Sequence, residues 1–171
     1  MSQNANAPAN TAHTSTSAPN SAKSAHPAKA AQLARVLVVD DSPVSRTMIS
    51  AHMKDEQFEA EEAENGAIAI EKIGMNRYDL ILMDIQMPVM DGYQAIRAIR
   101  EREKARGLKP TPIIAFTGSS YAEDVRKALD SGADLHVSKP VRKGALAEAI
   151  KGLIRFDAAG GVHRRSEAIA Q

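Results

Sequence analysis

The chain has 171 residues and a formal net charge of +1, which leaves room for one ordinary domain with tails and no strong field to attract nucleic acid or an anionic membrane. It contains no cysteine, which excludes disulfides and thiolate sites and suits a reducing compartment, so we predict a cytoplasmic protein. Short apolar runs exclude a membrane span, and an aromatic content of 4% argues against binding of single-stranded nucleic acid.

Both ends of the chain differ in composition from its centre. Residues 1–33 are rich in Ala, Ser, Asn, Thr and Pro and offer almost nothing for a core, so we predict a disordered tail. Residues 157–171 contain a Gly-Gly pair and a run of polar residues, which predicts a flexible C-terminal tail. The folded domain is therefore expected at 34–156.

Within this domain, apolar runs alternate with helical patterns. The run RVLVV (35–39) is rich in β-branched residues and predicts a buried strand. Val44, Met48 and Ala51 then recur at helical spacing, behind a Ser-Pro pair (42–43) that supplies a cap and a proline for the first helical position. The sequence thus opens with a strand followed by a helix.

The same order of strand and helix is repeated along the rest of the domain. The polar segment FEAEEA (58–63) predicts an edge strand, and Asn65-Gly66 leads from it into a short helix. The later elements are expected to be strand 80–83, helix 92–107, strand 112–116, helix 122–132, strand 135–138 and helix 143–156. Their predicted inward residues are Tyr93, Ile96 and Ile99, then Val125, Ala128 and Leu129, and then Leu146, Ala149, Ile150, Leu153 and Ile154.

Five strand–helix units joined by short loops predict an α/β fold, with a parallel five-stranded sheet and helices on both of its faces. In such sheets, ligands bind at the carboxyl ends of the strands. Asp40 and Asp41 follow the first strand, Asp84 follows the third, Thr117 the fourth and Lys139 the fifth. We expect these five side chains to share one rim.

Each of these residues has an ordinary structural explanation when it is taken alone. Asp41 can cap the first helix, and Asp84 can be a solvated loop end. Three converging carboxylates, however, raise one another's pKa values, and a fold tolerates this where a cation lies among them or where protonation is the purpose. The joint placement therefore favours a functional site.

The residue types indicate the chemistry of this site. Carboxylates without imidazole or thiolate suit Mg²⁺ or Mn²⁺, and a hydroxyl and an ammonium group suit phosphoryl oxygens. Together they describe a phosphoryl-transfer site in which a carboxylate can be the nucleophile. We predict Asp84 as this nucleophile, because it stands alone at the end of the middle strand, with Asp40, Asp41 and the backbone carbonyl of Gln86 as further metal ligands.

At this point the residues resemble the receiver domain of two-component response regulators. The segments VLVVDDSPVSR, LILMDIQMPVMDGYQAIRAIR, IIAFTG and HVSKPV occur in the family's order and at its spacings, over about residues 35–156. The resemblance implies a flavodoxin-like, doubly wound sheet with strand order 2-1-3-4-5 and five helices. It also implies a cis peptide bond at Lys139-Pro140.

The resemblance also implies a role for each residue of the site. Asp84 is the expected phosphoacceptor and, with Asp40 and Asp41, a metal ligand; Thr117 is the expected switch hydroxyl, and Lys139 the lysine that contacts the phosphoryl group. One position departs from the family pattern: His136 stands where a switch Tyr or Phe is usual, and an imidazole is smaller, polar and able to titrate near neutrality.

The predicted function is that of a single-domain response regulator rather than a classical enzyme. A sensor histidine kinase or a histidine phosphotransfer protein would supply the phosphoryl group. A downstream protein would read the face formed by the fourth helix, the fifth strand and the fifth helix. The alternatives are an intermediate in a phosphorelay, a receiver cut from a larger hybrid kinase, a haloacid-dehalogenase-like phosphatase and a nucleotide- or flavin-binding module. The sequence lacks the Asp-x-Asp after the first strand that such a phosphatase would have. It also lacks the Gly-rich loop expected of a nucleotide-binding module.

Overall fold

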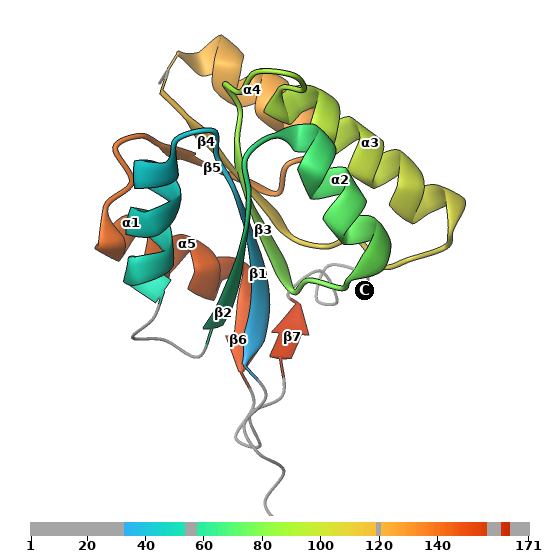
Figure 1. The fold of residues 1–171 in the computed structure, drawn as a ribbon, viewed down its shortest axis with the longest axis horizontal. Coiled ribbons are helices and arrows are strands. Elements are labelled where there is room, and N and C mark those ends of the chain that lie inside the picture. Colours follow the sequence, from blue (N-terminus) through green and yellow to red (C-terminus); the bar gives the residue numbers. More distant parts are fainter. Residues whose placement is uncertain (1–32, 54–57, 119–120, 157–161, 165–171) are drawn as a thin grey trace, which may run out of the picture.

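A parallel β-sheet with helices on both faces forms the body of the protein (Figure 1). The computed structural model describes residues 33–53, 58–118, 121–156 and 162–164. The predicted N-terminal tail lies outside them, apart from Leu33. In the described part of the chain, no helix combines the length and the hydropathy needed to cross a bilayer.

The elements follow the predicted alternation. The strands of the large sheet are β1 (Ala34–Val39), β2 (Phe58–Ala63), β3 (Leu80–Asp84), β4 (Ile113–Thr117) and β5 (Leu135–Ser138). The helices are α1 (Pro43–Met53), α2 (Gly66–Met75), α3 (Gly92–Ala105), α4 (Ala122–Asp130) and α5 (Lys143–Leu153). All five strands are parallel and lie in the order β2-β1-β3-β4-β5, which confirms the predicted fold class.

Helix starts and stops agree with the local signals in the sequence. Pro43 is the first residue of α1, and the Ser42 hydroxyl accepts a hydrogen bond from the Ser45 amide at 3.3 Å. Asn65 caps α2 by accepting the Ile68 amide at 3.0 Å. After α3, Gly107 has a φ of 61°, the left-handed conformation that glycine adopts at low cost just past a helix.

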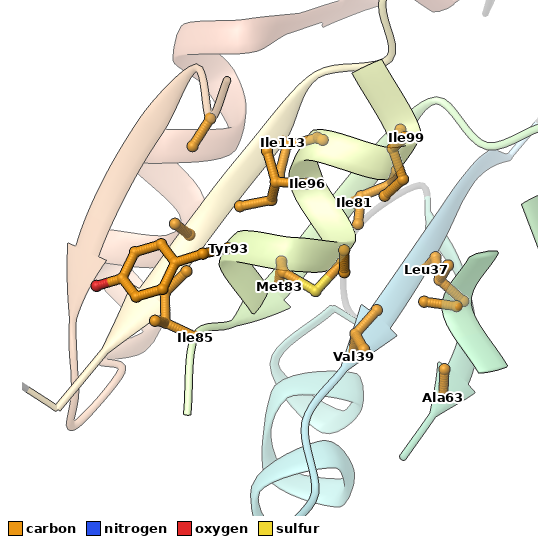
Figure 2. Packing of buried hydrophobic residues seen from close by; sticks show 14 of the residues in the cluster. Leu37, Val39, Ala63, Ile81, Met83, Ile85, Tyr93, Ile96, Ile99 and Ile113 are labelled. Carbon is orange, nitrogen blue, oxygen red and sulfur yellow. The ribbon is translucent and has the colours of Figure 1, made fainter. Parts of the chain in front are cut away.

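Side chains that alternate along the strands divide the core into two clusters. Leu37, Ile81 and Ile113 point toward the face covered by α2, α3 and α4. Figure 2 shows Ile96 and Ile99 of α3 beside Ile113 and Ile81. The intervening residues of the same strands point to the opposite face, which α1 and α5 cover. The predicted inward face of α3 is therefore confirmed.

Helix α1 does not bury the apolar residues that recur at helical spacing in its sequence. Val44 is 77% exposed, Met48 is 39% exposed and Ala51 is also exposed. The buried residues are Ile49 and Met53, one turn apart, which pack into the cluster on the α1 and α5 face. Residues at helical spacing define a stripe, but the docking of the helix on the sheet decides which stripe is buried.

Two further helices agree with the prediction only in part. In α4, Ala128 is fully buried, whereas Leu129 is 44% exposed and Val125 is partly buried. In α5, the predicted apolar stripe lies against the core. The helix ends at Leu153, however, and not at residue 156 as predicted.

The segment after α5 is a short antiparallel hairpin. Strand β6 (Ile154–Phe156) pairs with β7 (Val162–Arg164) in a separate two-stranded sheet. Ile154 is 2% exposed and Val162 packs against the same cluster as α5. The C-terminal tail predicted from residue 157 thus contains a strand at 162–164, and residues 157–161 and 165–171 lie outside the described part.

Strand β2 is the polar edge strand that its sequence predicts. It carries three glutamates among six residues, at positions 59, 61 and 62. Glu61 forms ion pairs with Lys72 at 2.7 Å and Arg35 at 3.2 Å, and Glu62 pairs with Arg46 at 3.0 Å. Neighbouring cations therefore compensate part of the negative charge of this edge.

The observed face of α1 gives a stability test. We expect Ile49→Ala to lower the free energy of unfolding by about 3 kcal/mol, because it leaves a cavity in the core. Val44→Ala, on the opposite side of the same helix, is the control and should change it by less than about 0.5 kcal/mol. Urea unfolding followed by circular dichroism measures both, and equal losses would contradict the observed orientation.

Candidate functional site

The carboxyl ends of the central strands bring the predicted site residues to one rim. Val39 of β1 pairs with Met83 of β3, so the residues that follow them, Asp40 and Asp84, are neighbours. On the other side of β3, the Ile85 amide donates to the Phe116 carbonyl at 3.0 Å and carries the pairing with β4 past the end of the strand. The order of the strands, with β1 and β4 on either side of β3, places Asp84 at the middle of the rim.

Three carboxylates form a compact cluster there. One oxygen each from Asp40, Asp41 and Asp84 lies within 4.8 Å of the others. Asp40 is fully buried and Asp84 is 2% exposed, whereas Asp41 faces solvent. The cluster therefore has a buried side, formed by Asp40 and Asp84, and a side open to solvent at Asp41.

Hydrogen bonds fix the orientation of Asp40. Its Oδ1 accepts the Ser42 amide at 2.9 Å, and its Oδ2 accepts the Ser45 hydroxyl at 2.6 Å. Arg46 donates to the Asp40 backbone carbonyl at 2.7 Å. The first turn of α1 thus holds this carboxylate. Ser45 is a site residue absent from the predicted set, and the signal for it is a hydroxyl in the first turn of a helix that follows two aspartates.

Lys139 connects the two buried carboxylates. Its Nζ donates to Asp40 Oδ2 at 2.8 Å and to Asp84 Oδ2 at 2.7 Å. The Lys139 amide donates to the Thr117 carbonyl at 2.8 Å, which ties the end of β5 to the end of β4. The Lys139-Pro140 peptide bond is cis, as the resemblance implied.

Burial and charge act in opposite directions on this group. The pKa of Asp84 is raised above its usual value, chiefly by burial and also by the Asp40 charge, although Lys139 works in the other direction. Burial alone lowers the pKa of the Lys139 ammonium, but its hydrogen bonds to Asp40 and Asp84 raise it above the ordinary lysine value. The pKa of Asp84 is therefore raised because burial and repulsion by Asp40 together outweigh the attraction of the Lys139 ammonium.

The donor set suits a hard divalent cation. Oxygen atoms from three carboxylates, one of them at the surface, match the ligands that Mg²⁺ and Mn²⁺ prefer. Three carboxylates face one ammonium group, and the pKa of Asp84 is raised chiefly by burial and also by the Asp40 charge. The Gln86 amide donates to Asp84 Oδ1 at 3.2 Å, and ligation by the Gln86 carbonyl stays a prediction.

The loop from β3 to α3 forms one wall of the site. The Met90 amide donates to the Pro88 carbonyl at 2.8 Å, so Val89 is the central residue of a γ-turn and has a φ of 70°. A β-branched residue in this conformation is strained, and such strain is concentrated near functional sites. The turn brings Gly92 back beneath the end of β3, where its amide donates to the Ile85 carbonyl at 3.0 Å.

An open cleft of about 470 Å³ extends from the acidic cluster toward α4. Asp41 and Thr117 line its inner end, and Asp124 and Lys127 line the side formed by α4. Lys127 lies over the Tyr93 ring, 4.3 Å from its centroid. The cleft leaves the solvent-facing side of the acidic cluster open to a ligand.

Thr117 and His136 are joined by a direct hydrogen bond. The Thr117 hydroxyl lies 2.9 Å from His136 Nε2. Thr117 is 2% exposed and His136 is half-buried, and burial lowers the pKa of the His136 ring. The sequence predicted these residues in related roles but gave no sign of this contact.

The close approach of Gly92 gives a second test. A Cβ on Gly92 would lie 2.2 Å from the Asp84 carbonyl oxygen and 2.7 Å from the Ile85 Cα, both backbone atoms that cannot rotate away. We expect Gly92→Ala to lower the free energy of unfolding by about 2 kcal/mol or more. Gly144→Ala in α5, where a Cβ meets nothing within 4 Å, should leave it unchanged or raise it. Comparable losses in chemical unfolding would contradict this.

The excess negative charge gives a third test. We expect Asp84→Asn to raise the free energy of unfolding by about 1 kcal/mol without divalent metal, since it removes a buried charge that repels Asp40 and leaves Lys139 paired with Asp40. Thermal unfolding in EDTA measures the change, and Glu101→Gln on the exposed side of α3 is the control for loss of one negative charge. A destabilised Asp84→Asn protein would contradict the charge imbalance.

Comparisons with known proteins agree with this arrangement. Residues 36–151 match the family model described as the response regulator receiver domain. A hybrid signal transduction histidine kinase L from Dictyostelium discoideum is 41% identical over 122 residues, which are 70% of this chain but 7% of that protein. The chain therefore spans only a small part of this much longer kinase.

Two solved structures are similar to the chain over most of its described part. The receiver domain of a sensor histidine kinase from Pseudomonas aeruginosa, with magnesium coordinated in its active-site cleft, is 33% identical with a TM-score of 0.63. The similarity covers 70% of this chain and 95% of that one. The complex of the Saccharomyces cerevisiae phosphotransfer protein Ypd1 with the receiver domain of Ssk1 gives 31% identity and a TM-score of 0.66, and covers 75% of this chain and 98% of that one.

The family match decides between the classes of protein that the sequence left open. It extends from β1 into α5, and so includes all five strands of the sheet and all of the clustered side chains. A flavin-binding module can share this strand order, so it is the family match, which includes the acidic cluster, that separates the classes. The chain belongs to the response regulator receiver domain family.

Proposed function

We propose that Asp84 accepts a phosphoryl group from a phosphohistidine on a partner protein, in a step that depends on Mg²⁺ or Mn²⁺. The observation that supports this most directly is the contact of Asp84 Oδ2 with the Lys139 ammonium at 2.7 Å, inside a cluster of three carboxylates at the end of a cleft. A nucleophilic oxygen, a cation for the phosphoryl group and ligands for a metal are thus within one site.

In the proposed reaction, a carboxylate oxygen of Asp84 attacks the phosphorus atom. An O–P bond forms, the N–P bond of the phosphohistidine breaks, and the donor imidazole keeps the electron pair and is then protonated by solvent. The raised pKa of Asp84 reflects poor solvation of its anion, which leaves the oxygen less stabilised by water before attack. Hydrolysis of the acyl phosphate by water later restores the carboxylate.

The surrounding side chains act on the phosphoryl oxygens. Lys139 already lies beside Asp84 and would pair with the new dianion, and the Thr117 hydroxyl would donate to it. Asp40, Asp41 and Asp84 would hold the metal ion, with the Gln86 carbonyl as a further ligand. A bound Mg²⁺ would compensate charge on the transferring group.

The proposed phosphodonor is a sensor histidine kinase or a histidine phosphotransfer protein. The similarity to the receiver domain of a sensor kinase and to the Ypd1–Ssk1 complex supports both candidates. Sequence relatives that are hybrid kinases favour a place within a phosphorelay as a second candidate beside a terminal regulator. The predicted cytoplasmic location stays a prediction.

The proposed output surface is the face formed by α4, β5 and α5. Of the residues of α4, only Ala128 is buried, so this helix is held to the domain by few apolar contacts. Elements with few buried contacts open at low cost, which suits a switch. Tyr121 and Leu129 are 79% and 44% exposed and would be available to a protein partner.

This function is tested by labelling with acetyl phosphate or a phosphorylated kinase, with and without Mg²⁺. We expect stoichiometric, metal-dependent labelling of the wild-type protein, none of Asp84→Asn, and a higher metal requirement for Asp41→Asn.

Asp124→Asn is the matched control for this experiment, because Asp124 lines the same cleft outside the acidic cluster. It should be labelled like the wild type. Persistent labelling of Asp84→Asn would move the acceptor elsewhere, and repeated turnover of a small phosphate ester would favour a phosphatase.

A further inference from the structure

We propose that His136 is a positioning residue whose Nε2–H donates to the Thr117 hydroxyl oxygen and thereby aims the Thr117 proton at the phosphoryl group on Asp84. The hydrogen bond of 2.9 Å between these two side chains carries the inference. It rests on the proposed function, since it assigns a proton relay to the same phosphorylated site.

The geometry of the sheet makes this contact a built feature. Leu135 and Val137 of β5 pack on the α1 and α5 face, so His136 between them points to the opposite face. Ala115 pairs with His136 and packs on that opposite face, and Thr117, two residues further along β4, shares its side. Two neighbouring strands therefore hold both side chains on the face that α4 covers.

Hydrogen-bond bookkeeping then fixes the direction of donation. A hydroxyl has one proton, and a phosphoryl oxygen at neutral pH only accepts. If Nε2 lacks a proton, Thr117 must donate to His136 and has nothing to offer the phosphoryl group. If Nε2 carries the proton, the Thr117 oxygen accepts that hydrogen bond, and the hydroxyl proton can be donated to the phosphoryl group. Phosphorylation therefore selects the ring form with a proton on Nε2.

Such a chain of donors is stronger than two separate bonds. Polarisation by the dianion strengthens the Thr117 donor and, through it, the His136 donor. Burial lowers the pKa of His136, so near neutrality the ring is uncharged and has a single N–H to place. A hydrocarbon ring at this position would fill the space but could not hold the Thr117 oxygen.

The first test is NMR of uniformly ¹⁵N-labelled protein in Mg²⁺, with and without the phosphoryl mimic beryllofluoride. Long-range ¹H–¹⁵N spectra report which ring nitrogen of His136 carries the proton. We expect the mimic to move His136 fully to the form protonated on Nε2 and to leave His52 of α1 unchanged.

The same spectra separate the two levels of the proposal. If the backbone amides of Ile85 and Gln86 shift with the mimic but His136 keeps Nε2 unprotonated, the relay is wrong and the phosphoacceptor site stands. If those amides do not shift at all, the phosphoacceptor site itself is wrong and the relay falls with it.

The second test uses variants. We expect His136→Phe to weaken beryllofluoride binding about fivefold, the loss of one hydrogen bond to a charged network. His136→Gln, whose amide nitrogen can donate to Thr117, should restore binding to within about twofold. His52→Gln is the control for loss of an imidazole elsewhere in the fold.

A third variant distinguishes positioning from packing. In a Thr117→Val background, His136→Phe should have no further effect on binding, because its influence passes through the hydroxyl. An unchanged fivefold loss in that background, or a His136→Gln protein as weak as His136→Phe, would overturn the proposal.

Discussion

Two buried carboxylates that share one ammonium group determine the design of this domain. Asp40 and Asp84 lie against each other at the ends of adjacent strands, and Lys139 contacts both. Charges buried in this way are tolerated only when they are paired, and the pairing here is incomplete, since one ammonium serves two carboxylates. A bound metal ion would add positive charge to this group, and a phosphoryl group on Asp84 would add negative charge beside Lys139. Both would change the balance between the carboxylates and the one ammonium group.

The parallel sheet is what makes this arrangement possible. Lys139 is 99 residues from Asp40 and 55 residues from Asp84, and only the common direction of β1, β3 and β5 brings their ends together. Apolar clusters on both faces keep the strands in place without contributing polar groups to the rim. The core thus lies along the strands, and the site lies at their carboxyl ends. The loops that follow the strands, such as the strained turn at Val89, can therefore shape the site without disturbing the core.

The sequence predicted the fold and the site to the extent that each depends on local pattern. Strand ends could be read from apolar runs, and this was sufficient to gather Asp40, Asp41, Asp84, Thr117 and Lys139. The buried face of α1 could not be read, because two apolar stripes of similar length compete and only docking on the sheet chooses Ile49 over Val44. Side-chain contacts across strands, such as Thr117 with His136, depend on register and rotamer, which a single sequence does not encode locally.

Strand β6 was predicted as the end of a helix, and tertiary contacts again explain the difference. Ile154 continues the apolar stripe of α5, but its φ of −121° and ψ of 139° are extended. Its amide donates to the Ile150 carbonyl at the end of α5, and β6 pairs with β7 with Ile154 opposite Arg164. A tertiary partner overrides the local preference, and the stripe stays buried in either conformation.

The acidic edge strand β2 has a consequence for assembly. An exposed edge of a sheet is open to pairing with the edge of another sheet, and three glutamates in six residues would place like charges opposite one another if two copies met there. Arg35, Arg46 and Lys72 pair with Glu61 and Glu62 and so offset only part of this negative charge, and the side chain of Glu59 is exposed. Aggregation through this edge is thereby discouraged, and association with other molecules is left to the helical surfaces.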